Sequence, residues 1–146
     1  MNKLDKNIIL IAAILGAFTI AIGAFGAHGL RALVDDNALR SFETGVRYQM
    51  YHVLALLFVG SWTAFSSKES KETLSILAST KKWVFRFFGF GILFFSGSLY
   101  LLSLQVVLPI SVKFLGPVTP IGGLLFVIGW LRLGYGIFKL KTQYSK

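Results

Sequence analysis

The chain has 146 residues, of which 55% are hydrophobic and 14% are charged, and 14 of them are phenylalanine. Soluble domains carry about a quarter charged residues, so this composition excludes an ordinary soluble domain. The net charge of +9 forms no basic face or arm, which argues against nucleic-acid binding, and the absence of cysteine excludes disulfides and thiolate metal sites.

The first predicted membrane span covers residues 7–27 and contains no charged side chain. A helix that crosses a bilayer needs about 20 apolar residues, and this run meets that length. Lys3 and Lys6 precede it, as basic residues precede a secretory signal. The run is longer than the roughly 7 to 15 apolar residues of such signals and has no convincing cleavage site, so we expect it to remain as a helix.

The segment after the first span carries both signs of charge and is predicted to form an interfacial helix capped by Asp36 or Asn37. Apolar residues then recur at spacings of three and four, so this helix should lead directly into the second span, residues 48–65. Glu43 and Arg47 are four residues apart, a spacing at which they can form an ion pair on one helix face.

The third and fourth predicted spans cover residues 85–104 and 118–138. The third begins after a long polar connection that includes Lys81, and the fourth begins at the turn between Pro117 and Pro120. The sequence therefore predicts an all-α fold, a single four-span membrane domain over residues 1–146 that forms a four-helix bundle.

Small residues mark the helix faces that should pack together, because they let backbones approach closely within lipid. In the first span, alanines and glycines recur four residues apart, and Gly16 and Gly23 belong to this pattern. In the fourth span, Gly122, Gly129 and Gly136 recur every seven residues and so share one face. We expect these glycine faces to contact neighbouring helices, either within the chain or in another copy.

Lysine and arginine residues concentrate in the two tails and in the middle connection, and are fewer in the other two connections. Cytoplasmic segments of membrane proteins carry the excess of basic residues. Both termini are therefore predicted to lie on the cytoplasmic side.

A cluster of polar side chains surrounds the end of the first span and the start of the second. His28 ends the first span and His52 lies about one turn inside the second, so we expect the two rings at similar depth. Ionisable groups at membrane depth are costly and often functional. The candidate polar site consists of His28, Glu43, Arg47, Tyr48, Gln49 and His52.

Three interpretations of the two histidines remain open from the sequence. The rings can donate to backbone carbonyls or to Glu43 and close the end of the bundle. They can be axial ligands of a haem, as histidines are in membrane cytochromes, although nothing else marks a porphyrin pocket. They can also belong to a site for a proton, an ion or a small ligand. Because the usual metal-ligand spacings are absent, we predict no metal ion. No cofactor is predicted for the chain either.

Arg132 is the other unusual residue, since it lies inside the fourth span. The simplest expectation is that its side chain extends towards the cytoplasmic headgroups. Otherwise it pairs within the bundle. Spans three and four contain no acidic residue, so such a partner would be a carbonyl, a hydroxyl such as that of Ser96, Ser98 or Ser103, or another subunit.

Four segments of the chain resemble, in the same order, the signature segments of an uncharacterised family of small inner-membrane proteins. That family is known as domain of unknown function 423, and its eukaryotic relatives are called transmembrane protein 256. The segments are GAFGAHGL (23–30), FETGVRYQMYHVLALL (42–57), FFSGSLYLLSL (94–104) and GPVTPIGGLLFVIGW (116–130).

The resemblance implies a four-helix, multi-pass protein of the bacterial inner membrane, with no established activity. The signature histidines of the family correspond to His28 and His52, and its Tyr-Gln pair to Tyr48 and Gln49. Two features depart from the family pattern, namely a long connection over residues 68–82 and an arginine at position 132.

No nucleotide-binding loop, catalytic triad order or zinc-protease helix is present, so an enzyme is the least supported class of function. We predict a non-enzymatic accessory or scaffold component of a membrane assembly, whose partners are the lipid bilayer and either further copies or other membrane proteins. The alternative is a small transporter, channel or ligand-binding protein that uses the polar cluster around His28 and His52.

Overall fold

The computed structural model describes residues 2–62 and 70–144, with side chains described up to residue 140. The α-helices are α1 (Lys3–His28), α2 (Asp36–Ser61), α3 (Lys71–Gly91), the short α4 (Gly97–Ser103) and α5 (Val118–Tyr144). Short helical segments are η1 (Leu30–Ala32), the π-helical η3 (Ile92–Ser96) and η4 (Lys113–Leu115).

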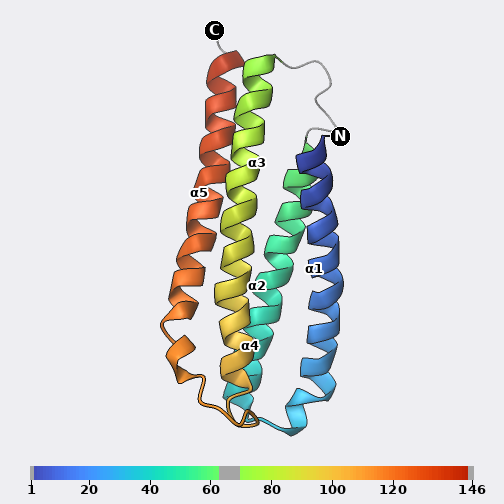
Figure 1. The fold of residues 1–146 in the computed structure, drawn as a ribbon, viewed down its shortest axis with the longest axis vertical. Helices are drawn as coiled ribbons and strands as arrows, with labels where there is room; N and C mark the ends of the chain where they lie inside the picture. The colour runs from blue at the N-terminus through green and yellow to red at the C-terminus, as the bar shows by residue number, and fades with distance from the viewer. Residues whose placement is uncertain (1, 63–69, 145–146) are drawn as a thin grey trace.

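The helices form an elongated bundle in which α1 and α2 run antiparallel, as do α3 and α5 (Figure 1). Helix α1 packs along α2, and α5 packs along α3. Segment η3 joins α3 and α4 into one continuous helix. The described bundle therefore consists of four long helices, namely α1, α2, the joined α3–η3–α4 and α5. Both ends of the chain lie at the same end of the bundle (Figure 1). The predicted all-α four-helix bundle is confirmed.

Among the described residues, three helical stretches are long and apolar enough to cross a membrane: Lys3–Ala32, Lys71–Ser103 and Lys113–Leu140. Helix α2 is more polar, because its first half carries the charges of the predicted interfacial helix. It nevertheless runs along most of α1, since Gly26 faces Phe42 at one end and Gly60 faces Ile9 at the other. The end of the predicted second span, residues 63–65, lies outside the described residues.

Local capping explains where α2 and α3 begin. Asp35, in an extended conformation, accepts a hydrogen bond from the Ala38 backbone N–H at 2.8 Å, so Asp35 caps α2 in place of the predicted Asp36 or Asn37. Ser70 caps α3 in the same way, accepting from the Thr73 N–H at 3.2 Å.

Helix α3 begins at Lys71, well before the predicted third span, so most of the predicted polar connection is helical. Leu77, Val84 and Phe88 recur at helical spacing and are buried in the core. Lys81 lies on the same face as these residues, and it is buried as well. The prediction that Lys81 lies in the connection between the second and third spans is therefore wrong, because it is part of helix α3.

The glycine face of α5 packs against α3 and η3 of the same chain. A Cβ atom at Gly122 would overlap the Phe95 backbone, and one at Gly129 would overlap the Phe88 ring. Gly136 is similarly close to Thr80. The three glycines, spaced seven residues apart, thus make close contacts at three successive levels of α5. All three contacts are with residues of the same chain.

On the other side of the bundle, the predicted glycines of α1 face α2. A Cβ at Gly16 would lie 3.4 Å from Val53, and one at Gly23 would lie 3.3 Å from Val46. The main hydrophobic core lies between the two helix pairs. Its buried members include Ile8, Ala12, Val53, Leu56, Val59, Val84, Phe88, Ile92, Phe126 and Leu133.

Candidate functional site

His52 is buried between the helix pairs, with only 4% of its surface exposed. Its Nδ1 lies 2.7 Å from the Tyr48 carbonyl, and its Nε2 lies 3.2 Å from the indole nitrogen of Trp130. A carbonyl can only accept and an indole N–H can only donate, so Nδ1 carries the proton and Nε2 accepts. The ring also stacks on Phe126, with centroids 3.5 Å apart. Both nitrogens of this neutral ring are therefore occupied.

Gln49 connects three helices through a buried chain of hydrogen bonds. Its Nε2 donates to Thr19 Oγ1 at 2.8 Å, and Thr19 in turn donates to the Leu15 carbonyl at 2.6 Å. The Tyr100 hydroxyl donates to Gln49 Oε1 at 3.0 Å. The amide thus satisfies groups from α1, α2 and α4 in the bundle interior, where an unpaired polar group would be costly.

His28 lies far from His52. It is the last residue of α1 and is exposed. His52 lies at the level of Gly16, because that glycine faces the next residue of α2, Val53. At 1.5 Å of rise per residue, the two histidines are separated by roughly 17 Å along the bundle axis. The expectation of similar depth is therefore wrong, and one haem iron cannot reach both rings.

The remaining residues of the predicted cluster do not converge on one point. Glu43 and Arg47 are exposed and line a shallow recess of about 240 Å³ at the end of the α1–α2 pair. Arg47 donates to Thr44 Oγ1 at 3.1 Å, and in the described part of the chain it forms no ion pair with Glu43. Tyr48 is partly exposed, and its ring packs against Phe95. The described residues also contain no group of three metal-ligating side chains.

A buried ion pair joins the first and third helices. Lys81 Nζ lies 2.7 Å from Asp5 Oδ1, and each side chain is only 1% exposed. These two residues are 76 positions apart, and neither is among the site residues predicted from the sequence. The helical spacing of Leu77, Lys81, Val84 and Phe88 was the signal that could have placed Lys81 on a buried face.

Arg132 reaches from α5 to α3. Its Nη1 donates to Thr80 Oγ1 at 3.1 Å and its Nη2 to Ser79 Oγ at 3.3 Å, so the partners are hydroxyls as one alternative expected. They are not the hydroxyls that were named from the sequence: Ser98, for example, bonds to Thr119, and the buried Ser96 and Ser103 hydroxyls have no partner among the described residues.

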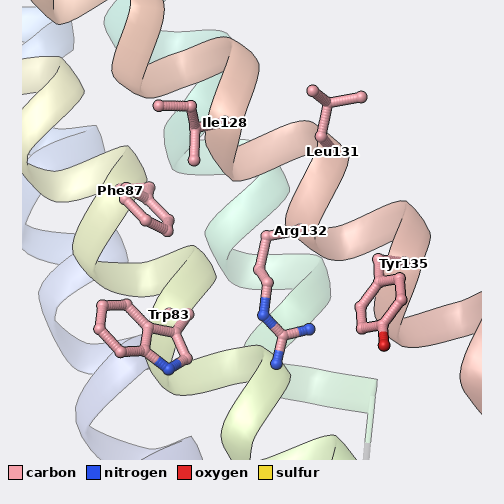
Figure 2. Close-up of a pocket in the computed structure, with 6 residues that line it drawn as sticks. All are labelled: Trp83, Phe87, Ile128, Leu131, Arg132 and Tyr135. Atoms are coloured by element: carbon pink, nitrogen blue, oxygen red, sulfur yellow. The ribbon is translucent and has the colours of Figure 1, made fainter.

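The Arg132 side chain also borders a groove on the outer surface of the bundle, with a volume of about 480 Å³. Figure 2 shows Trp83 and Phe87 on α3 opposite Ile128 and Leu131 on α5, with the guanidinium directed towards α3. Tyr135 completes the lining next to Arg132.

Sequence comparison identifies the family. The family described as "Protein of unknown function (DUF423)" matches residues 22–123. The chain belongs to the DUF423 family. Within this DUF423 protein, the matched range contains His52, Gln49 and Lys81, whereas Asp5 and Arg132 lie outside it.

Close relatives of this DUF423 protein are named as membrane proteins. It is 42% identical over 134 residues to a UPF0382 membrane protein of Staphylococcus aureus, covering 92% of this chain and 97% of the relative. It is 38% identical over 139 residues to a UPF0382 membrane protein of Haemophilus influenzae, covering 95% and 99%. For the UPF0382 membrane protein YwdK of Bacillus subtilis, the identity is 38% over 128 residues, covering 88% and 93%. No solved structure matches.

Proposed function

We propose that this DUF423 membrane protein is a non-enzymatic accessory component of an assembly in the bacterial inner membrane. Its interior supports a structural role, because the polar groups of Gln49 and His52 are bonded to other groups of the bundle. A transported solute or a reaction would need such groups to be accessible. The contacts of an accessory component instead lie on its outer surface.

The observation that carries this proposal is a second ridge of small residues on α1, which faces outwards. Ala13, Ala17, Ala21 and Ala24 are exposed and recur at spacings of three and four residues. Such ridges let helices approach closely within lipid. The small residues on the inner face of α1, Gly16 and Gly23, already pack against α2. No helix of the described chain covers the four alanines on the outer face. We infer that this outer face receives a transmembrane helix from another protein molecule.

Cysteine crosslinking in membranes tests this inference, because the natural chain has no cysteine. An Ala17→Cys variant is expected to form a discrete crosslinked species, either with a second copy or with a partner protein. Leu54→Cys, which is exposed at a similar depth on α2, is the matched control and should remain uncrosslinked. Equal crosslinking of the two variants, or none at Ala17, would refute an assembly through this ridge.

The distribution of charge supports cytoplasmic termini. Exposed basic residues gather at the end of the bundle where both termini lie, and they include Lys3, Lys6, Lys71 and Lys82. The positive-inside rule places that end in the cytoplasm. A membrane-impermeant maleimide added to intact cells should therefore label Arg31→Cys and leave Lys71→Cys unlabelled. The reverse pattern would invert the topology.

A further inference from the structure

Two basic side chains at neighbouring levels of the bundle differ in their partners. Lys81 on α3 is neutralised by Asp5. Arg132 on α5 bonds to the hydroxyls of Thr80 and Ser79, and within the described residues all the partners found for it are neutral. A guanidinium at membrane depth is costly unless it is paired. The contrast with Lys81 points to an anion that comes from outside this chain.

Arg132 retains the donors that such an anion requires. A guanidinium carries five N–H groups, and Thr80 and Ser79 take two of them. Arg132 also lines a polar recess of about 220 Å³. Lys139 lines this recess too, seven residues beyond Arg132 on α5, and supplies a second cation. The planar guanidinium can donate several hydrogen bonds at once, which suits the recognition of a phosphate group.

The polar recess continues into an apolar groove directed towards the middle of the bundle. The groove of Figure 2 shares Arg132 and Tyr135 with the recess. It shares Trp83 and Phe87 with a further groove of about 590 Å³, which extends to Phe94. From Trp83 to Phe94 the helical rise is roughly 16 Å, close to half of a hydrocarbon core of about 30 Å. The path thus matches the depth of one lipid leaflet.

Charge selects the kind of lipid. Helix α5 contains no acidic residue, and the acidic residue of α3 is Glu72 in its first turn. Arg86 also borders the deeper groove, so the charges along the path are positive. We propose that the α3–α5 surface holds one anionic glycerophospholipid, with its phosphate on Arg132 and one acyl chain along Trp83 and Phe87. This site is separate from the α1 ridge and does not depend on the proposed assembly.

Quenching of Trp83 by brominated lipids tests the proposal directly. A Trp62→Phe/Trp130→Phe variant leaves Trp83 as the one tryptophan of the chain. In phosphatidylcholine nanodiscs, a minor fraction of brominated phosphatidylglycerol should quench Trp83 about fivefold more effectively than the same fraction of brominated phosphatidylcholine, the factor expected for one basic side chain at an anionic headgroup.

Substitutions of Arg132 test whether this residue causes the preference for the anionic lipid. Arg132→Gln should abolish it, and Arg132→Lys should retain part of it, because the charge stays while the planar fork is lost. Arg47→Gln is the matched control, since Arg47 is exposed at the other end of the bundle, and it should leave the preference unchanged. Circular dichroism and gel filtration establish that each variant is folded.

Native mass spectrometry of the protein with all its tryptophans gives a second measurement, which does not rely on the fluorescence variants. One phosphatidylglycerol adduct should persist at collision energies that remove phosphatidylcholine, and an excess of inorganic phosphate should not displace it. The proposal is overturned by equal quenching from both lipids, which indicates ordinary boundary lipid. Absence of quenching by either brominated lipid indicates a groove covered by protein, and it overturns the proposal as well. A preference for the anionic lipid that persists in Arg132→Gln also overturns it.

Discussion

The two helix pairs of the bundle are held together in different ways. In the α1–α2 pair, both helices contribute small residues, and each faces a side chain: Gly26 faces Phe42, and Gly60 faces Ile9. In the α3–α5 pair, α5 supplies a regular glycine face, and Gly122 lies directly against the Phe95 backbone. At the level of Gly122 the second pair therefore depends more strictly on the absence of a side chain, because the backbone of Phe95 cannot move aside as a flexible side chain can.

The contacts between the pairs add polar bonds to the apolar core. They include the Asp5–Lys81 ion pair and the hydrogen bonds from Tyr100 to Gln49 and from Trp130 to His52. In lipid, apolar surface gives little drive for helices to associate, so polar bonds and close packing carry the specificity. Small residues thus set the spacing within each pair, and the pairs are joined by these polar contacts together with the apolar core between them.

Removing one partner of the ion pair should have the largest effect on stability. Asp5→Asn removes the carboxylate of a buried ion pair, and breaking such a pair typically costs about 3–5 kcal/mol. The free energy of unfolding, measured by denaturant titration in detergent micelles, should fall by that amount. The separation of the two helix pairs, followed by spin labels on α1 and α3, should become broader.

A double variant separates the cost of breaking the ion pair from the stability that the intact pair contributes. Asp5→Leu/Lys81→Met removes both charges from a site that is 1% exposed, so it should recover most of the stability lost in Asp5→Asn. If the double variant is as unstable as Asp5→Asn, the pair itself is essential to the junction, and desolvation of the single charge is not the main cost.

Close approach within the α3–α5 pair is tested next. Gly122→Leu places a side chain against the Phe95 backbone, and overpacking of this kind costs about 1–3 kcal/mol or more. Gly134→Leu on the same helix is the matched control, because no atom lies within 4 Å of a Cβ built there. The thermal midpoint should fall for Gly122→Leu alone. Similar midpoints for the two variants would contradict the strict packing assigned to this pair.

The sequence contained enough information for the helices but not for the way they are joined. Hydrophobic runs predicted the apolar stretches, and the seven-residue spacing predicted the glycine face of α5, because both depend on neighbours along one helix. Lys81 was predicted to lie in the connection between the second and third spans, because a charged residue usually marks the end of a span. Its partner Asp5 is 76 residues away, and no local pattern indicates such a pairing.

The error over His28 and His52 has a related cause. The depth of a residue in a hairpin depends on where the connection turns and how the two helices align. Here α1 extends to His28 and α2 begins at Asp36, so the two helices overlap over nearly their full length. His52 then lies opposite the middle of α1 and not its end. Interhelical register is a tertiary property, and apolar runs alone do not define it.

The smallest predicted effect concerns His52 and tests whether the polar contacts between the pairs are structural. His52→Phe keeps a flat ring that can stack on Phe126, but it removes the acceptor for the Trp130 indole N–H. The loss should be about 0.6–1.5 kcal/mol in the free energy of unfolding, the usual range for one hydrogen bond between membrane helices. Trp130→Phe should cost a similar amount, and the double variant should cost little more than either single one, because both substitutions remove the same bond. Additive losses of stability would show that the two side chains act separately. An unchanged stability for His52→Phe would contradict the structural role of His52 and favour a functional one.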